Sequence, residues 1–258
     1  MILFVSDLHL GRGTPEATRD AERAAVAMVR AHDAALAAGG TLVLLGDVFD
    51  QYIEYRHLVP KGAPRLAGLL ADLTDRGVRV LYAVGNRDPW HGSYFECEIG
   101  VTVLRRPTRV EADGLGVYLA HGDAHGRTAS AGRSLFQPLL RAPTMARLYR
   151  MGLPGDAGFA LARWAARRFG SDGTATPAEE AALARAAAGL LARPEIDVVA
   201  FGHAHAPALA RMPGGTYLNP GYWFGDRTFA RIDAAGPALF RWTDSRAVPF
   251  SPAAPALL

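Results

Sequence analysis

The sequence predicts an α/β protein built around a mainly parallel β-sheet. Three short apolar segments, residues 2–6, 41–45 and 78–84, are separated by two segments with the composition of helices. This strand–helix–strand alternation implies right-handed crossovers between parallel strands, and it gathers the carboxyl ends of those strands at one edge of the sheet. We therefore expect functional side chains at that edge.

The two helical segments have recognisable ends. The first begins with an N-cap threonine followed by a proline, residues 14–15, and is expected to run as one helix to the glycines at 39–40. The second is predicted over residues 64–76, because Gly77 is typical of a position just beyond a helix.

The second half of the chain gives the fold an α+β character. Two apolar segments, residues 108–112 and 115–120, flank Asp113-Gly114, which predicts an antiparallel hairpin. After residues 126–176, which break the pattern, the predicted elements are a helix at 177–192, a strand at 196–201 and short strands around Leu209, Tyr217, Phe229 and Leu239. We expect one core formed by residues 1–125 and 177–250, a helical insertion at 126–176 and a loose tail at 251–258.

The composition is that of a globular protein. At 258 residues, half of them hydrophobic, the chain can bury one large core. No uninterrupted apolar run approaches the roughly eighteen residues of a membrane span. Met1 leads directly into the first strand without a basic leader, so we expect a cytoplasmic location. The single cysteine, Cys97, excludes an internal disulfide.

Five predicted strands are followed directly by polar side chains. These are Asp7 and His9, Asp47, Asn86, His121, and His203 with His205. Carboxylate, amide oxygen and imidazole are ligands of hard and borderline metal ions. Each motif alone has a simpler explanation, since a histidine at a strand end is more often structural and Gly-Asn is often only a turn. Together they predict a metal centre.

The number of donors indicates two ions, because a single zinc would leave too many of them unused. We assign one ion to Asp7, His9, Asp47 and His205 and the other to Asp47, Asn86, His121 and His203, so that Asp47 is the bridge. Two ions that share a carboxylate can activate a bridging water and neutralise a phosphoryl group. This suits hydrolysis of a phosphoester or phosphoanhydride.

The other four of the eight histidines lack this context. We predict that His32 lies on a helix surface and that His57, His91 and His125 lie in loops. His125 is of interest because it is close to His121 in the sequence.

The ordered motifs Asp-x-His, Gly-Asp-x-x-Asp, Gly-Asn-x-Asp, His-Gly-Asp and Gly-His-x-His resemble those of the calcineurin-like metallophosphoesterase superfamily, over about residues 2–240. The resemblance implies a four-layer αββα sandwich, in which helices flank two sheets. It also implies manganese, iron or zinc, and we expect two Mn²⁺ ions. By the same resemblance, Asn86, Arg87 and His121 are the expected catalytic residues.

Arg87 departs from the superfamily pattern, which usually has histidine at this position. An arginine does not readily donate a proton at neutral pH, but it can bind phosphate oxygens in a bidentate fork. This favours a leaving group that needs no protonation, such as a phosphate, and therefore a diphosphate substrate.

The Gly-Asn-Arg-Asp motif resembles that of the UDP-2,3-diacylglucosamine diphosphatases of lipid A biosynthesis, as does the Glu54-Tyr55-Arg56 loop. The resemblance implies a product pair of UMP and lipid X, the acylated sugar 1-phosphate. We expect Tyr55, Arg56, Arg87, Asp123 and His125 to contact the substrate. The loop after Asp123 lacks an additional acidic residue that is associated with this family.

The insertion is cationic and apolar. Eight arginines and two aspartates give residues 126–172 a charge of +6, whereas the whole chain carries +3. On a helix over residues 157–169, Phe159, Ala162, Ala166 and Phe169 would share one face and Arg163 and Arg167 another. This predicts a cover for acyl chains that binds the inner-membrane surface peripherally, with Arg163 and Arg167 on the substrate side. Alternatively, the apolar face packs on the domain and the arginines are only solvated.

Three other functions agree less well with the sequence. A basic insertion could grip nucleic acid, but its arginines alternate with aliphatic residues rather than stacking aromatics, so we expect no nucleic-acid partner. A phosphodiesterase or phosphatase for a soluble nucleotide would have no use for an apolar cover. A membrane-binding scaffold without activity would be expected to have lost metal ligands. The sequence gives no sign of an obligate protein partner.

Overall fold

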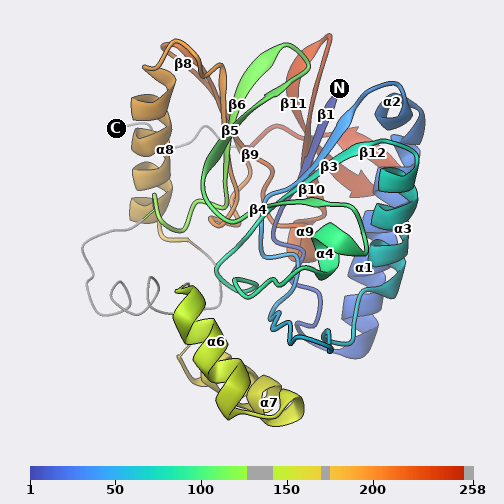
Figure 1. Cartoon of the computed structure of the whole chain (residues 1–258). Coiled ribbons are helices and arrows are strands. Elements are labelled where there is room, and N and C mark those ends of the chain that lie inside the picture. The colour runs from blue at the N-terminus through green and yellow to red at the C-terminus, as the bar shows by residue number, and fades with distance from the viewer. Residues whose placement is uncertain (127–141, 170–174, 253–258) are drawn as a thin grey trace.

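The computed structural model describes residues 1–126, 142–169 and 175–252, and only the backbone of residues 143, 166, 167 and 169. The predicted tail therefore lies largely outside the described residues, as does the first part of the predicted insertion. Within them, two β-sheets pack face to face, with helices on both outer sides (Figure 1).

The larger sheet has seven strands in the order β12-β11-β10-β1-β2-β3-β4. Their bounds are β1 Ile2–Val5, β2 Thr41–Leu44, β3 Arg79–Ala83, β4 Thr102–Leu104, β10 Thr228–Asp233, β11 Gly236–Thr243 and β12 Arg246–Pro249. The smaller sheet has five strands in the order β5-β6-β7-β9-β8. Their bounds are β5 Thr108–Ala112, β6 Leu115–Ala120, β7 Val198–Phe201, β8 Ala208–Met212 and β9 Gly215–Asn219.

Three apolar layers hold the sandwich together. Helices α1 (Pro15–Ala31) and α3 (Pro64–Asp75) pack on the outer face of the larger sheet through residues such as Met28 and Leu70. The two sheets bury Phe4, Val43 and Leu119 between them. Helix α8 (Pro177–Leu191) covers the smaller sheet. The predicted four-layer αββα fold is confirmed.

The strand register brings the predicted functional residues to one edge. Strands β1, β2 and β3 are parallel, with Val5 opposite Leu44 and Leu44 opposite Tyr82. In the smaller sheet β6 and β7 are also parallel, with Ala120 opposite Phe201. Within each sheet, the loops after these strands therefore start at the same level. The hairpin β5–β6 is antiparallel, as predicted.

The first predicted helix is wrong in one respect, because it is broken at His32. Helix α1 ends at Ala31, and a second helix, α2 (Asp33–Ala37), begins immediately after the break. The prediction that His32 lies on a helix surface is also wrong. The residue is only 8% exposed, its Nδ1 lies 2.8 Å from the Met28 carbonyl oxygen, and its ring packs edge-on against Phe229. This buried contact turns the chain between the two helices.

Four short elements had no clear sequence signal. They are β4, β12, α4 (Tyr94–Cys97) and α9 (Trp223–Asp226). Each has three or four residues, too few for a hydrophobic period to show.

Helices α6 (Pro143–Gly152) and α7 (Gly155–Phe169) lie together at one end of the molecule (Figure 1). Ala146, Phe159 and Ala162 pack against Ile53 and Trp90 from loops of the core. Part of the predicted apolar face of α7 therefore packs on the domain, while the side chains of residues 166 and 169 lie outside the described part. In the described ranges, no helix is long and apolar enough to cross a bilayer.

His91 lies in a loop, as predicted, but its ring is buried. It stacks on Tyr52 at 4.4 Å between ring centroids and meets Tyr82 and Phe95 edge-on. Neither of its ring nitrogens has a hydrogen-bond partner in the structure. Burial lowers the pKa of His91 to about 3.

Replacing His91 by phenylalanine is expected to make the fold less sensitive to acid. Between pH 6.5 and 3 the unfolded chain binds a proton at His91 that the folded chain does not, so stability falls as the pH falls through this window. The loss amounts to at most about 3 kcal/mol at pH 4. Urea unfolding of the wild type and His91→Phe at pH 7 and pH 4 measures it. The exposed His57→Phe is the control, and an unchanged acid dependence in His91→Phe would contradict the prediction.

Candidate metal centre

The structure brings all seven predicted ligands to the shared edge of the two sheets. Asp7 and His9 follow β1, Asp47 follows β2 and Asn86 follows β3, all from the larger sheet; His121 follows β6, and His203 and His205 follow β7, from the smaller sheet. The centre is thus built from both halves of the sandwich.

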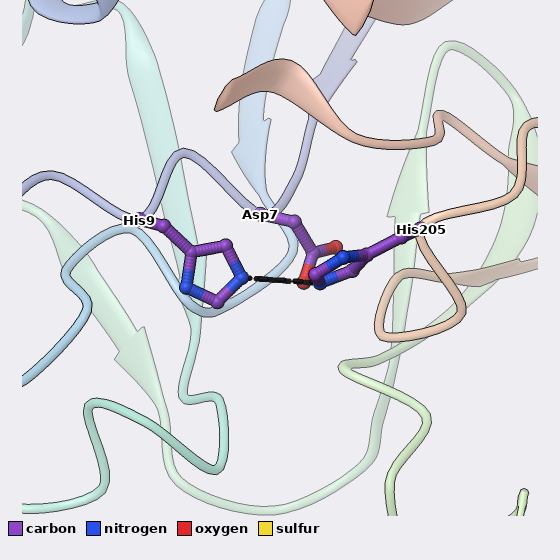
Figure 2. A group of neighbouring side chains, drawn as sticks. All are labelled: Asp7, His9 and His205. Carbon is purple, nitrogen blue, oxygen red and sulfur yellow. Dashed lines mark hydrogen bonds and ion pairs between the residues drawn. The ribbon is translucent and has the colours of Figure 1, made fainter. Parts of the chain in front are cut away.

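The first cluster consists of Asp7, His9 and His205, whose side chains converge from two loops, the one after β1 and the one after β7 (Figure 2). His205 Nε2 lies 3.1 Å from His9 Nε2 and 3.2 Å from Asp7 Oδ1, and His9 Nε2 lies 3.6 Å from the same oxygen. Ligands bound to one ion at about 2.1 Å are separated by about 3.0–3.5 Å. Asp7 Oδ1 is buried and has no hydrogen-bond partner. The cluster therefore fits a divalent cation.

The second cluster consists of Asp7, Asp47 and His121, and it shares Asp7 with the first cluster. His121 Nε2 lies 3.0 Å from Asn86 Oδ1 and 3.5 Å from Asp47 Oδ2. Asp47 Oδ2 is also 3.9 Å from His9 Nε2, so this carboxylate lies between His9 of the first cluster and His121. The His203 ring meets the His121 ring edge-on, with centroids 5.2 Å apart. This geometry fits the expected bridge, while the individual ligand roles stay predictions.

The backbone at the centre adopts a rare conformation. Five of the seven predicted ligands, Asp7, His9, Asp47, His203 and His205, have φ between 42° and 69°. This left-handed region is disfavoured for residues with a side chain, and it persists only where surrounding contacts impose it. A Cβ added at Gly85 would lie 2.1 Å from Asp47 Oδ1, so the loops are also packed closely. Such strain at the predicted ligands supports a functional role for them.

The charges of the centre support one another. Burial opposes ionisation of Asp47, but His121 and His9 outweigh this and hold its pKa well below the usual range. Burial likewise opposes protonation of His121, but Asp47 and Asp7 raise its pKa to about 10. Among the protein's own groups, the His121 imidazole and the Asp47 carboxylate thus stabilise each other's charged form. A bound cation could take over this role.

Asp88 is a buried residue whose role the sequence did not reveal. It accepts hydrogen bonds from the backbone of Val48 and Gly85 and from the Tyr82 hydroxyl. Burial and the charge of Asp47 raise its pKa to about 6. Asp88 therefore ties the loops after β2 and β3 together. Its place at the end of the Gly-Asn-x-Asp motif was the available signal.

The predicted substrate contacts are placed less uniformly. The Arg87 backbone amide donates a hydrogen bond of 2.7 Å to Asp47 Oδ1. The Arg87 side chain therefore extends from a backbone position at the metal centre. Asp123 is close enough to raise the pKa of His121. By contrast, His125 stacks on Phe201. This packing makes a structural role for His125 the simpler explanation.

The remaining four predicted contacts are Tyr55, Arg56, Arg163 and Arg167. Tyr55 belongs to the apolar cluster that receives Phe159 of α7. Arg56 and Arg163 are exposed, and the side chain of residue 167 lies outside the described part. Their contacts with a substrate stay predictions.

The sequence profile of calcineurin-like phosphoesterases matches residues 1–207, four-fifths of the chain and all seven predicted ligands. The chain belongs to this family. Members of the family use divalent metals, which agrees with the two clusters of donors.

Curated relatives share a more specific name. A protein named UDP-2,3-diacylglucosamine hydrolase from Ralstonia nicotianae is 34% identical over 83% of this chain and 80% of its own length. One of the same name from Stenotrophomonas maltophilia R551-3 is 30% identical over 92% of this chain and 96% of its own. Among solved structures, the E. coli phosphoesterase YfcE matches over 96% of both chains with 16% identity and a TM-score of 0.46. The family assignment does not depend on that likeness.

Proposed function

We propose that this phosphoesterase hydrolyses the diphosphate of UDP-2,3-diacylglucosamine to UMP and 2,3-diacylglucosamine 1-phosphate, lipid X, in lipid A biosynthesis. The observation that carries the proposal is the position of the Asp47 carboxylate between His9 and His121, with the Arg87 amide hydrogen-bonded to it. The relatives of that name support the choice of substrate.

The residues of the centre have separate tasks. Asp7, His9, Asp47 and His205 would hold one divalent ion, and Asp47, Asn86, His121 and His203 the other. When bound, two such ions supply an activated water and neutralise charge on the phosphoryl oxygens. The imidazole and carboxylate donors are compatible with Mn²⁺, our first choice, and also with iron or zinc.

Two residues, His121 and Arg87, have orienting roles at the centre. The Nδ1–H of His121 donates to the Leu45 carbonyl oxygen at 2.7 Å, which directs Nε2 toward the centre. Arg87 would bind oxygens of the diphosphate in a fork without giving up a proton. A phosphate leaving group needs no proton from it, so the arginine fits hydrolysis of a phosphoanhydride.

Besides the apolar face that packs on the core, α6 and α7 have an exposed apolar surface, which supports a lipid substrate. Leu148 and Met151 on α6 are 64% and 74% exposed, and Leu161 and Trp164 on α7 are 44% and 57% exposed. Each pair is three residues apart and shares one helix face. Together with the arginines of the same helices, this apolar surface has the composition of a site that binds an anionic bilayer. We therefore propose that the protein binds peripherally to the cytoplasmic side of the inner membrane. We also propose that segment 126–176 covers the acyl chains of the substrate.

Changing Leu148 and Met151 together to aspartate is expected to weaken binding to anionic vesicles at least about tenfold. Each side chain contributes up to about 1.5–3 kcal/mol if the bilayer buries it fully. Sedimentation with phosphatidylglycerol vesicles measures the effect. Val248→Asp, an exposed apolar position on β12, is the control. Equal binding by both variants and the wild type would exclude this surface.

The function is tested by incubating the purified protein and Mn²⁺ with UDP-2,3-diacylglucosamine. We expect release of UMP and lipid X in equal amounts. Activity restricted to soluble nucleotides or phosphodiesters would instead support a phosphodiesterase or phosphatase that acts on a soluble nucleotide. Vesicle binding without hydrolysis of either substrate class would support the scaffold.

A further inference from the structure

We infer that Tyr222, Arg12 and Asp50 form a positioning chain that orients His9 and His205 and thereby sets the affinity for one of the two metal ions. The inference rests on the dinuclear centre of the proposed function, but not on the lipid nucleotide. None of the three residues is a predicted ligand.

Tyr222 contacts both imidazoles of the first cluster. Its ring stacks on His205 with centroids 4.2 Å apart and an angle of 7° between the planes. It also meets the His9 ring edge-on at 5.8 Å and 71°. One aromatic ring therefore restricts the rotation of both ligands.

The chain continues from the Tyr222 hydroxyl to the far nitrogen of His9. Arg12 Nη1 donates to the Tyr222 hydroxyl at 3.2 Å, and Arg12 Nε donates to Asp50 Oδ1 at 2.9 Å. That oxygen lies 3.4 Å from His9 Nδ1. A carboxylate next to Nδ1 favours the tautomer whose Nε2 is free to bind a metal.

The backbone anchors this chain to the same loops as the ligands. The Trp223 and Phe224 amides, directly after Tyr222, donate to the carbonyl oxygens of Ser6 and Asp7. The Arg12 amide donates to the His9 carbonyl oxygen at 3.0 Å. These backbone hydrogen bonds therefore fix the positions of Tyr222 and Arg12 relative to the ligands that they contact.

The second cluster is held in a different way. His121 is oriented by the Leu45 carbonyl oxygen, and no residue of the chain Tyr222–Arg12–Asp50 takes part in that contact. Loss of the chain should therefore affect one ion more than the other. This difference between the two sites distinguishes positioning from a general loss of stability.

The test measures metal binding rather than turnover. Tyr222→Leu removes the ring, Tyr222→Phe removes only the hydroxyl, and Asp50→Asn removes the carboxylate charge. Mn²⁺ and Co²⁺ titrations followed by calorimetry, and the visible spectrum of the Co²⁺ form, report the affinity and geometry of each site. Tyr94→Leu, an aromatic change on α4 that contacts none of these residues, is the matched control. Thermal unfolding in chelator shows that each variant is folded.

We expect Tyr222→Leu and Asp50→Asn to weaken one of the two binding steps by about 10- to 100-fold and to alter the Co²⁺ spectrum, with a smaller effect for Tyr222→Phe. Combining Tyr222→Phe with Asp50→Asn should cost less than the sum of the two, because both interrupt one chain. Unchanged affinities, equal weakening of both steps, or full additivity would overturn the inference. A wild type that binds two ions but does not release UMP would overturn only the proposed function.

Discussion

Replacing Asp47 by alanine is expected to abolish metal binding and hydrolysis together. Its carboxylate lies between His9 and His121 and accepts the Arg87 amide, so its loss removes the bridge and loosens the arginine loop. Bridged ions contribute several kcal/mol to the stabilisation of a phosphoryl transition state, so we expect kcat to fall by at least about 1000-fold. Metal analysis after gel filtration and the UMP assay measure the two losses.

The matched control for this prediction is Asp75→Asn, an exposed aspartate at the end of α3. It should retain both ions and full activity. An Asp47→Ala protein that is free of metal but fully functional would contradict the dinuclear mechanism and would favour the scaffold.

Changing Arg87 to methionine is expected to lower kcat by about 100- to 1000-fold without loss of metal. Removing one preorganised donor to a developing oxyanion has a cost of this size. Arg87→Lys should recover only part of the activity, because an ammonium cannot form the planar fork. The comparison requires kcat and metal content for each variant.

A further variant tests why arginine occupies this position. Arg87→His restores the residue usual in the superfamily, and it should increase activity on phosphodiesters whose leaving group needs a proton, relative to the diphosphate. Arg23→Gln, on the exposed side of α1, is the control. If Arg87→Met retains wild-type kcat, the arginine does not contact the reacting phosphate.

Much of the fold was predictable because strand ends and helix ends carry local signals. The three parallel strands and the hairpin were identified from apolar runs and glycines, and parallel pairing alone brings Asp7 and Asp47 to the same edge; the register of the strands is seen only in the structure. The helix break at His32 was not predictable, because it depends on a buried contact with Phe229, a residue nearly 200 positions away.

The site divides in the same way. Its predicted ligands lie in short motifs directly after strands, so the chain itself delivers them to the sheet edge. Tyr222 has no such motif, and its stacking on His205 exists only once the turn after β9 has folded against the loop that contains Asp7. Residues that orient ligands through tertiary contacts leave little pattern in a single sequence.

The origin of the ligands in both sheets has a consequence for the folding of the protein. Ions shared between Asp7 and His205 would cross-link positions far apart in the chain, and closing a long loop restricts the unfolded ensemble strongly. Protein contacts already join the two sheets at this edge, because the His203 amide donates to Asp7 Oδ2 and His121 Nδ1–H donates to the Leu45 carbonyl oxygen. Bound ions would act as a further, reversible cross-link between the two sheets, so removal of the ions with a chelator is expected to lower the temperature of thermal unfolding.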